Sequence, residues 1–142
     1  MSVHRSVTIL GVTGSVGSST AALLAHAGRA RFSTAAVTAQ SNVAALAQHA
    51  IALGAGIAVI GDEGRYKDLK EALGGSGIVC AAGPAAIVEA AERKSDIVMA
   101  SIVGTAGLRP TLAAVRRGAT IALANKECLV TAGRQFMALA QE

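Results

Sequence analysis

The chain has 142 residues, 52% of them hydrophobic, and a net charge of +4 at neutral pH. This length is typical of a single domain. No apolar stretch approaches the roughly 20 residues of a membrane-spanning helix, and the first apolar run is too short for a secretory signal. Aromatic residues make up only 2% and no basic run occurs, which argues against nucleic acid as a partner. Cys80 and Cys128 lack C-x-x-C spacing, so we expect a reduced cytoplasmic protein. Together these features predict a protein that binds neither nucleic acid nor membrane.

The charges are unevenly distributed along the chain. No Asp or Glu precedes Asp62, whereas Arg5, Arg29 and Arg31 all lie in that acid-free half. A segment without acids around a binding loop favours an anionic ligand. The alternative is that a small, Ala-rich segment simply carries few charges.

Short apolar runs alternate with longer Ala-rich stretches along the whole chain. We expect strands at 7–10, 32–39, 56–60, 78–81, 97–101 and 119–123. Between them we expect helices at 15–27, at 42–53 with Asn42 as the cap, at 83–92, and one that has Pro110 in its first turns and ends at 117–118. A polar turn at 62–64 precedes a charged helix that ends near Gly74, and a last helix follows Asn125. This alternation predicts an α/β fold in one domain, with a Rossmann-like, doubly wound, mainly parallel sheet and helices on both faces.

Three glycines follow the first predicted strand with the spacing G-x-x-G-x-x-G, at Gly11, Gly14 and Gly17. The first glycine allows a tight turn, the second lets the backbone approach a pyrophosphate, and the third permits close packing of helix on strand. The hydroxyls of Thr13 and Ser15 add hydrogen-bond donors to the amides of the helix N-terminus. The alternative is a tight turn without a ligand, whereas a Walker loop is excluded because no Lys-Ser or Lys-Thr follows the glycines.

The second predicted strand ends in Gln40, Ser41 and Asn42. An NAD enzyme would place an Asp or Glu near this point to hold the ribose hydroxyls of adenosine. Because no carboxylate is present and all three side chains can donate hydrogen bonds, the segment favours NADP over NAD. Arg31, which precedes the strand, is not expected to reach this site.

Two later loops also follow predicted strands. The loop within 99–108 contains Gly104 and Gly107, and we expect it to face the crevice where α/β sheets bind ligands. Asn125, Lys126 and Glu127 follow the last strand in the same way. In one interpretation Lys126 holds an anionic or hydroxylated group and its neighbours orient it. In the other, Asn125 caps a helix and Glu127 interacts with the helix dipole.

These segments together resemble one family, the 1-deoxy-D-xylulose 5-phosphate reductoisomerases of the non-mevalonate isoprenoid pathway. The resemblance rests on residues 7–17 (VTILGVTGSVG), Ala39 with Asn42-Val43, residues 99–108 (MASIVGTAGL) with Pro110-Thr111-Leu112, and residues 123–130 (LANKECLV). It spans almost the whole chain and implies an enzyme that isomerises 1-deoxy-D-xylulose 5-phosphate and reduces it with NADPH to 2-C-methyl-D-erythritol 4-phosphate. The implied coenzyme contacts are Thr13, Gly14, Ser15, Val16, Gln40, Ser41, Asn42, Ala100, Ser101, Ile102, Asn125 and Glu127, and Lys126 is the implied substrate contact.

The chain departs from the family pattern at two positions and omits its catalytic half. Ser41 stands where family members commonly have a basic residue, and Cys128 where they usually have Ser. The family's Asp-x-Glu site for Mg²⁺ or Mn²⁺ does not occur in the sequence. Because the last apolar helix also ends without a cap, we expect a domain truncated before the metal- and substrate-binding domain, inactive alone, from a homodimeric enzyme. The alternatives are another NADP-dependent reductase domain and a non-catalytic nucleotide-binding module.

Overall fold

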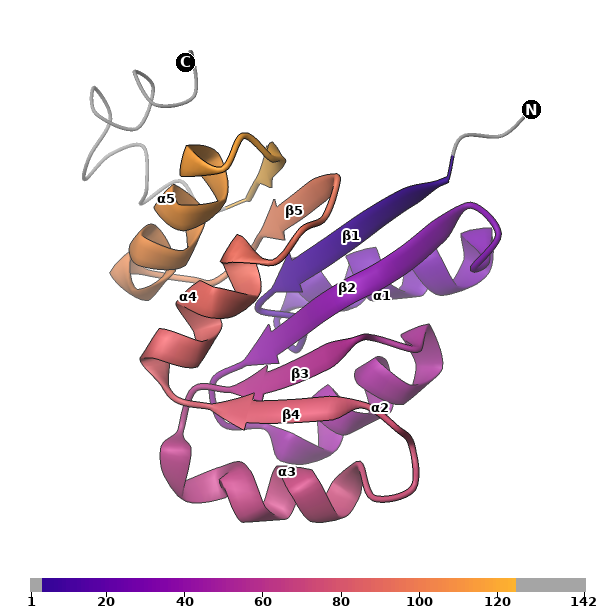
Figure 1. The fold of residues 1–142 in the computed structure, drawn as a ribbon, viewed down its shortest axis with the longest axis vertical. Helices are drawn as coiled ribbons and strands as arrows, with labels where there is room; N and C mark the ends of the chain where they lie inside the picture. Colours follow the sequence, from indigo (N-terminus) through magenta and orange to yellow (C-terminus); the bar gives the residue numbers. More distant parts are fainter. Residues whose placement is uncertain (1–3, 125–142) are drawn as a thin grey trace.

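A computed structural model describes residues 4–124, which form a parallel sheet with helices on both faces (Figure 1). The sheet has six strands in the order β4-β3-β2-β1-β5-β6, and every neighbouring pair is parallel. The strands are β1 (Arg5–Leu10), β2 (Phe32–Ala39), β3 (Ile57–Ile60), β4 (Val79–Ala82), β5 (Ile97–Ala100) and β6 (Thr120–Leu123). All the carboxyl ends of the strands therefore lie at one edge of the sheet.

The helices divide between the two faces of the sheet. They are α1 (Ser15–Ala27), α2 (Val43–Leu53), α3 (Tyr66–Ala72), α4 (Pro84–Glu92) and α5 (Leu108–Arg116), with 3₁₀ turns η1 (Glu63–Arg65) and η2 (Thr105–Gly107). Helices α1, α2 and α3 pack side by side on one face, and α4 packs with α5 on the other. Right-handed crossovers between parallel strands place the helices in this way.

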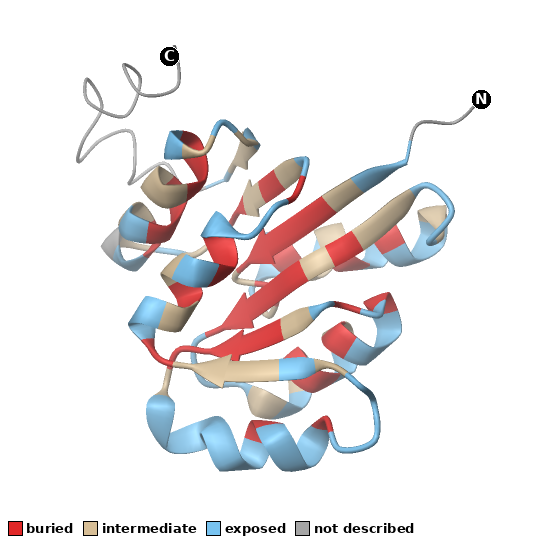
Figure 2. Ribbon diagram, viewed as in Figure 1, coloured by how far each residue is buried: buried red, intermediate tan, exposed pale blue. Residues whose placement is uncertain are grey.

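Small aliphatic side chains fill the core on both faces. Ile9, Leu46 and Ile60 are fully buried between the sheet and the helices α1 to α3. Leu10 and Val98 lie in the layer under α4 and α5. Figure 2 shows the buried residues concentrated on the central strands and on the inner sides of the helices. Alanines at the helix–sheet contacts allow close approach, which explains how a chain with few aromatic residues still forms a dense interior.

The predicted elements agree closely with the structure. Helix α1 and strand β2 have the predicted bounds, and Asn42 caps α2 by accepting a hydrogen bond from the Ala45 N–H at 3.1 Å. Helix α5 begins at Leu108, so Pro110 is its third residue, where the missing N–H would have no partner within the helix. The predicted last helix lies outside the described residues. Between residues 4 and 124, no helix is long and apolar enough to cross a membrane.

Polar contacts close the amino-terminal edge of the sheet. The guanidinium of Arg117 donates to the carbonyls of Ala91 and Ser95 and to the Ser95 hydroxyl, at 2.8, 3.0 and 2.7 Å. Ser95 in turn accepts a bond from the buried Thr8 hydroxyl at 3.1 Å. Partial burial lowers the pKa of the Arg117 guanidinium. The group nevertheless stays charged at neutral pH. This network ties the end of α5 to β1 and to the loop before β5.

Asp96 ties the same edge to β1 through the backbone. Its carboxylate accepts hydrogen bonds from the N–H and the hydroxyl of Ser6, at 2.8 and 3.3 Å. The backbone bond is the main reason that the pKa of Asp96 lies below its usual value of 3.8, and Arg5 and His4 contribute further. Since the ionised form is favoured in the folded protein, this carboxylate stabilises the fold above the unfolded-state pKa.

We therefore expect an acid-dependent loss of stability at this position. The stabilisation is present above about pH 4 and is lost as the pH falls through the lowered, folded-state pKa of Asp96. Urea denaturation of the wild type and Asp96→Asn at pH 7 and at pH 3 should show the wild type more stable at pH 7, with a smaller difference at pH 3. A difference that is the same at both pH values would contradict this role.

Candidate functional site

The order of the strands creates a crevice at the carboxyl edge of the sheet. The chain runs from β1 outward to β2 through α1, whereas β5 lies on the other side of β1 and is reached through α4 on the opposite face. The loops that follow β1 and β5 therefore diverge, which is where open α/β sheets bind their ligands. A cavity of about 180 Å³ lies here, lined by Gly11, Thr13, Gly14, Thr38, Ala39, Gln40, Ile87, Ser101, Ile102 and Val103.

Gly11 holds the floor of this crevice in place. Its φ of 81° lies in the left-handed region, and a Cβ there would come within 3.0 Å of the Ser101 carbonyl oxygen. The Gly11 N–H donates to the Thr38 hydroxyl at 3.0 Å, and the Val12 N–H donates to the Thr38 carbonyl at 2.8 Å. The loop after β1 is thus fastened to β2 and lies against the end of β5.

The other two glycines of the motif differ in their surroundings. A Cβ on Gly17 would collide with the Gly11 carbonyl oxygen and would lie 2.8 Å from the Cα of Val12. Gly17 therefore permits α1 to approach the loop. A Cβ on Gly14 would meet only the Gly11 carbonyl oxygen, at an ordinary 3.6 Å, and the Gly14 φ of −75° suits any residue. The fold does not require glycine at position 14, and the absence of a side chain there leaves space for a ligand beside the N-terminus of α1.

Helix α1 begins at this opening, since its N-cap residue Gly14 lines the cavity. The first intrahelical bond runs from the Ser18 N–H to the Gly14 carbonyl at 2.8 Å. The N–H groups of Ser15, Val16 and Gly17 precede it and have no acceptor within the helix. No acidic residue occupies the first turn of α1. The helix dipole and the amides together favour a phosphate here.

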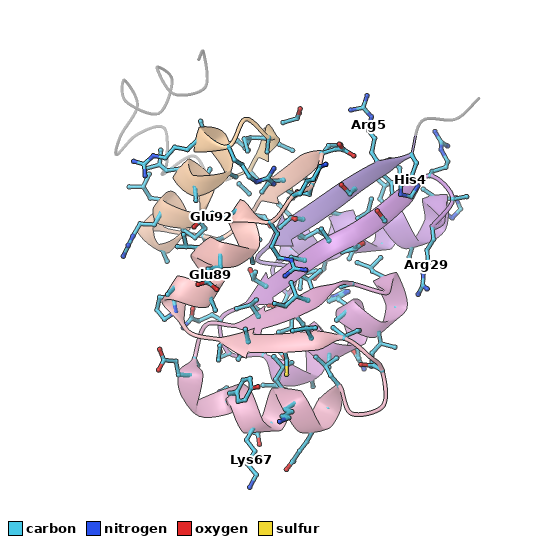
Figure 3. All side chains as sticks on the ribbon, in the orientation of Figure 1. His4, Arg5, Arg29, Lys67, Glu89 and Glu92 are labelled. Carbon is cyan, nitrogen blue, oxygen red and sulfur yellow. The ribbon has the colours of Figure 1, made fainter. Side chains whose placement is uncertain are left out.

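The cationic residues of the acid-free half lie elsewhere. Arg5 begins β1 and Arg31 directly precedes β2, so both are at the amino edge of the parallel sheet. Figure 3 shows Arg5 and Arg29 at that end of the structure, together with His4. The opening near α1 is therefore suited to an anion by its amides and by its lack of acids rather than by these arginines.

The predicted residues after β5 take different positions. Ile102 lines the cavity. Ala100 is buried and does not line it. The hydroxyl of Ser101 donates to the Leu10 carbonyl at 2.6 Å, which joins the ends of β5 and β1. Val103, with 86% of its surface exposed, extends from the same loop at the rim of the cavity.

The predicted residues after β2 stay together at the surface. Gln40 lines the cavity, and Ser41 and Asn42 follow it as exposed residues. The side-chain oxygen of Asn42 is engaged by the α2 cap, so its amide NH₂ group remains as a donor. Thr13 and Gly14 line the same cavity as Gln40, and Ser15 and Val16 follow them in the first turn of α1. The structure thus brings the two predicted groups to the same edge, whereas Asn125, Lys126 and Glu127 lie outside the described residues.

Two features of this site were not found from the sequence. Thr38 anchors the glycine loop and Ile87 from α4 forms part of the cavity wall. Ile87 also joins the crevice to a second cavity of about 680 Å³ between α4 and the start of α5, which Gln40 and Ile102 line as well. Glu89 and Glu92 on α4 (Figure 3) border this second cavity with Arg109. Only the strand order reveals these neighbours, since no sequence motif relates α4 to the end of β2.

Between residues 4 and 124, no group of three or more His, Cys, Asp or Glu side chains is placed to hold a metal ion.

Comparisons with known proteins point to one family. The family model described as 1-deoxy-D-xylulose 5-phosphate reductoisomerase matches residues 7–133. The reductoisomerase of Rhodospirillum centenum is 61% identical over 94% of this chain, and that of Rhizobium meliloti is 56% identical over 95%. The chain spans about a third of the length of these relatives, 33% and 35%.

Solved structures agree with this assignment. The reductoisomerase of Zymomonas mobilis in complex with NADPH superposes with a TM-score of 0.95 at 49% identity, over 98% of this chain and 36% of that chain. A DOX-P reductoisomerase in complex with NADPH, fosmidomycin and magnesium superposes with a TM-score of 0.89 at 34% identity, over 96% of this chain and 34% of that chain.

The same substitution at two glycines should have different effects on the stability of the fold. We expect Gly17→Ser to destabilise the fold by about 1–3 kcal/mol, because the added side chain overpacks the contact with Gly11. Gly14→Ser should leave the free energy of unfolding within about 0.5 kcal/mol of the wild type or raise it, since Ser is a favoured N-cap residue. Urea denaturation measures both. Equal losses in the two variants would refute the distinction drawn between these positions.

Proposed function

Because the chain belongs to the 1-deoxy-D-xylulose 5-phosphate reductoisomerase family, we propose that residues 1–142 form the NADPH-binding domain of such an enzyme. The enzyme isomerises 1-deoxy-D-xylulose 5-phosphate and reduces it to 2-C-methyl-D-erythritol 4-phosphate. The observation that carries this proposal is the unfilled space at Gly14 beside the free amides of α1, at the point where the strand order reverses. The related enzyme of Zymomonas mobilis, with the same fold, was solved with NADPH.

The proposed coenzyme extends across the crevice. Thr13, Gly14, Ser15 and Val16 would hold its pyrophosphate, since their amides and two hydroxyls can donate. Gln40, Ser41 and Asn42 would hold its adenosine phosphate. Ala100, Ser101 and Ile102 would contact it toward its nicotinamide end, and Asn125 and Glu127 would be further contacts.

The residues that line the crevice suit the chemistry of NADPH. The NADPH phosphates are anionic, and the crevice offers amides, hydroxyls and no carboxylate among its lining residues. The nicotinamide is largely apolar, and Ile102 and Val103 present apolar surface beyond β5. The coenzyme, when bound, supplies the hydride. The residues of this chain bind it and orient it, and Ser101 keeps β5 in register with β1 below it.

The remaining parts of the reaction are proposed to lie in the portion of the family's sequence that this chain does not span. There we place the carboxylates that hold Mg²⁺ or Mn²⁺, and most of the site for the sugar-phosphate substrate, with Lys126 as a contact from this chain. Relatives solved with magnesium and with fosmidomycin support a divalent ion and a small-molecule ligand. We further propose that the whole enzyme is a cytoplasmic homodimer.

A titration tests the coenzyme directly. We expect the chain to bind NADPH at least tenfold more tightly than NADH, a difference of about 1.4 kcal/mol. Gly14→Val should weaken NADPH binding because its methyl groups fill the space that the pyrophosphate needs. Ala22→Val, on an exposed position of the same helix, is the matched control. Isothermal calorimetry gives both affinities, and unchanged binding by Gly14→Val would remove the glycine loop from the site.

The division of the reaction between two parts of the enzyme gives a separate test. We expect purified 1–142 to show no NADPH oxidation when 1-deoxy-D-xylulose 5-phosphate and Mg²⁺ are added, because the proposed metal ligands lie beyond it. The matching full-length enzyme from a relative serves as the positive control. Measurable turnover by 1–142 would show that this chain contains the complete catalytic machinery.

A further inference from the structure

The end of β2 lacks a cation where the proposed coenzyme needs one. This inference rests on the proposed function, in which Gln40, Ser41 and Asn42 face the adenosine of NADPH. The 2′-phosphate that distinguishes NADPH from NADH is a dianion at neutral pH, and enzymes usually meet it with an Arg. All three residues of this segment are uncharged. The cation must therefore come from another element at the same edge of the sheet.

The loop after β3 lies directly beside this segment. Strands β2 and β3 pair in register up to Ala39 and Ile60, and the contact continues beyond them. The Asp62 N–H donates to the Gln40 carbonyl at 2.9 Å. The Gln40 side chain lies over Gly61, where a Cβ would collide with its amide oxygen. The residues after Gly61 are therefore held next to the proposed 2′-phosphate position.

Arg65 is the cation of this loop. Its Nε lies 3.3 Å from the Asp62 Oδ2, with 49% of the arginine side chain exposed. The other Asp62 oxygen accepts from the Gly64 N–H at 3.0 Å. The ion pair offsets the negative charge of Asp62, which would otherwise repel a phosphate beside Gln40. It also engages the guanidinium through Nε, and an arginine has further N–H donors on its two terminal nitrogens.

Other cations are less well placed. Arg109 shares the larger cavity with Gln40 but also with Glu92, whose charge opposes an anion there. Lys67 points away from the sheet on the outer side of α3 (Figure 3). Arg31 lies at the opposite end of β2. Among these candidates, only Arg65 is connected to the Gln40 segment through a chain of hydrogen-bonded contacts.

We propose that Arg65 is a specificity-determining residue that donates hydrogen bonds to the 2′-phosphate of NADPH from the loop after β3. Its guanidinium and the side chains of Gln40 and Ser41 then approach that phosphate from two neighbouring strands. Asp62 orients the arginine and is itself neutralised by it. A charged contact of this kind is lost when the 2′-phosphate is absent, so it sets the preference between the two coenzymes.

Calorimetric titrations with NADPH, NADH and adenosine 2′,5′-bisphosphate test this assignment. The last ligand carries the 2′-phosphate without the nicotinamide end, so it reports on this contact alone. We expect Arg65→Gln to weaken NADPH and the bisphosphate at least tenfold and NADH less than twofold. Arg65→Lys should retain part of the preference, because it keeps the charge and loses the planar donor pair. Lys67→Gln, which removes the same charge two residues away, should bind like the wild type.

A double variant separates a direct contact from simple neutralisation of Asp62. If Arg65 donates to the phosphate, Asp62→Asn combined with Arg65→Gln still lacks the NADPH preference. Recovery of that preference in the double variant would overturn the proposal, as would equal losses for NADPH and NADH, no loss in Arg65→Gln, or a loss produced by Arg109→Gln instead. A wild-type chain that binds neither coenzyme would overturn the proposed function itself. If the wild type and Arg65→Gln both bind NADPH and prefer it over NADH to the same extent, only this inference is overturned.

Discussion

The close contact between Gly17 and the carbonyl of Gly11 determines the geometry on which the site depends. Because both residues are glycines and no side chain separates them, the first turn of α1 lies directly on the loop that leaves β1. The same loop is fastened to β2 through Thr38 and lies against β5 at Ser101. A helix N-terminus is a useful phosphate site only when its amides are fixed relative to the strands. Here three strands and one helix meet within a few residues of Gly11, so the proposed anion site is formed before any ligand arrives.

Much of this arrangement was predictable from local pattern. The bounds of α1 and β2 follow from the change between Ala-rich helical spacing and short β-branched runs, and Asn42 was recognisable as a cap. The roles of Gly11 and Gly17 follow from motif spacing, and the structure supplies the steric reason for each. These features were accessible because each depends on residues that are close in sequence.

The contacts that sequence reasoning missed depend instead on strand order. Thr38 and Ile87 come from parts of the chain that no motif links to the glycine loop. Likewise, Asp62 was predicted in a polar turn at 62–64 and Arg65 follows that turn, and only the pairing of β2 with β3 places this segment beside Gln40. Strand direction also determines where the cations of the acid-free half lie. Arg5 begins β1 and Arg31 directly precedes β2, so both are at the amino edge of the sheet, away from the glycine loop.

The polar groups named at the two edges of the sheet differ in their partners. At the amino edge, Asp96 bonds with Ser6, and Arg117 bonds with Ser95, which also serves Thr8. At the carboxyl edge, the leading amides of α1 have no acceptor within the helix, and Arg65 is half-exposed. Donors left without protein partners at a surface are hydrated, and a phosphate can replace that water with a stronger, charge-assisted interaction. Substitutions of exposed residues at the carboxyl rim, such as Arg65, can therefore alter ligand preference while the contacts that close the amino edge stay intact.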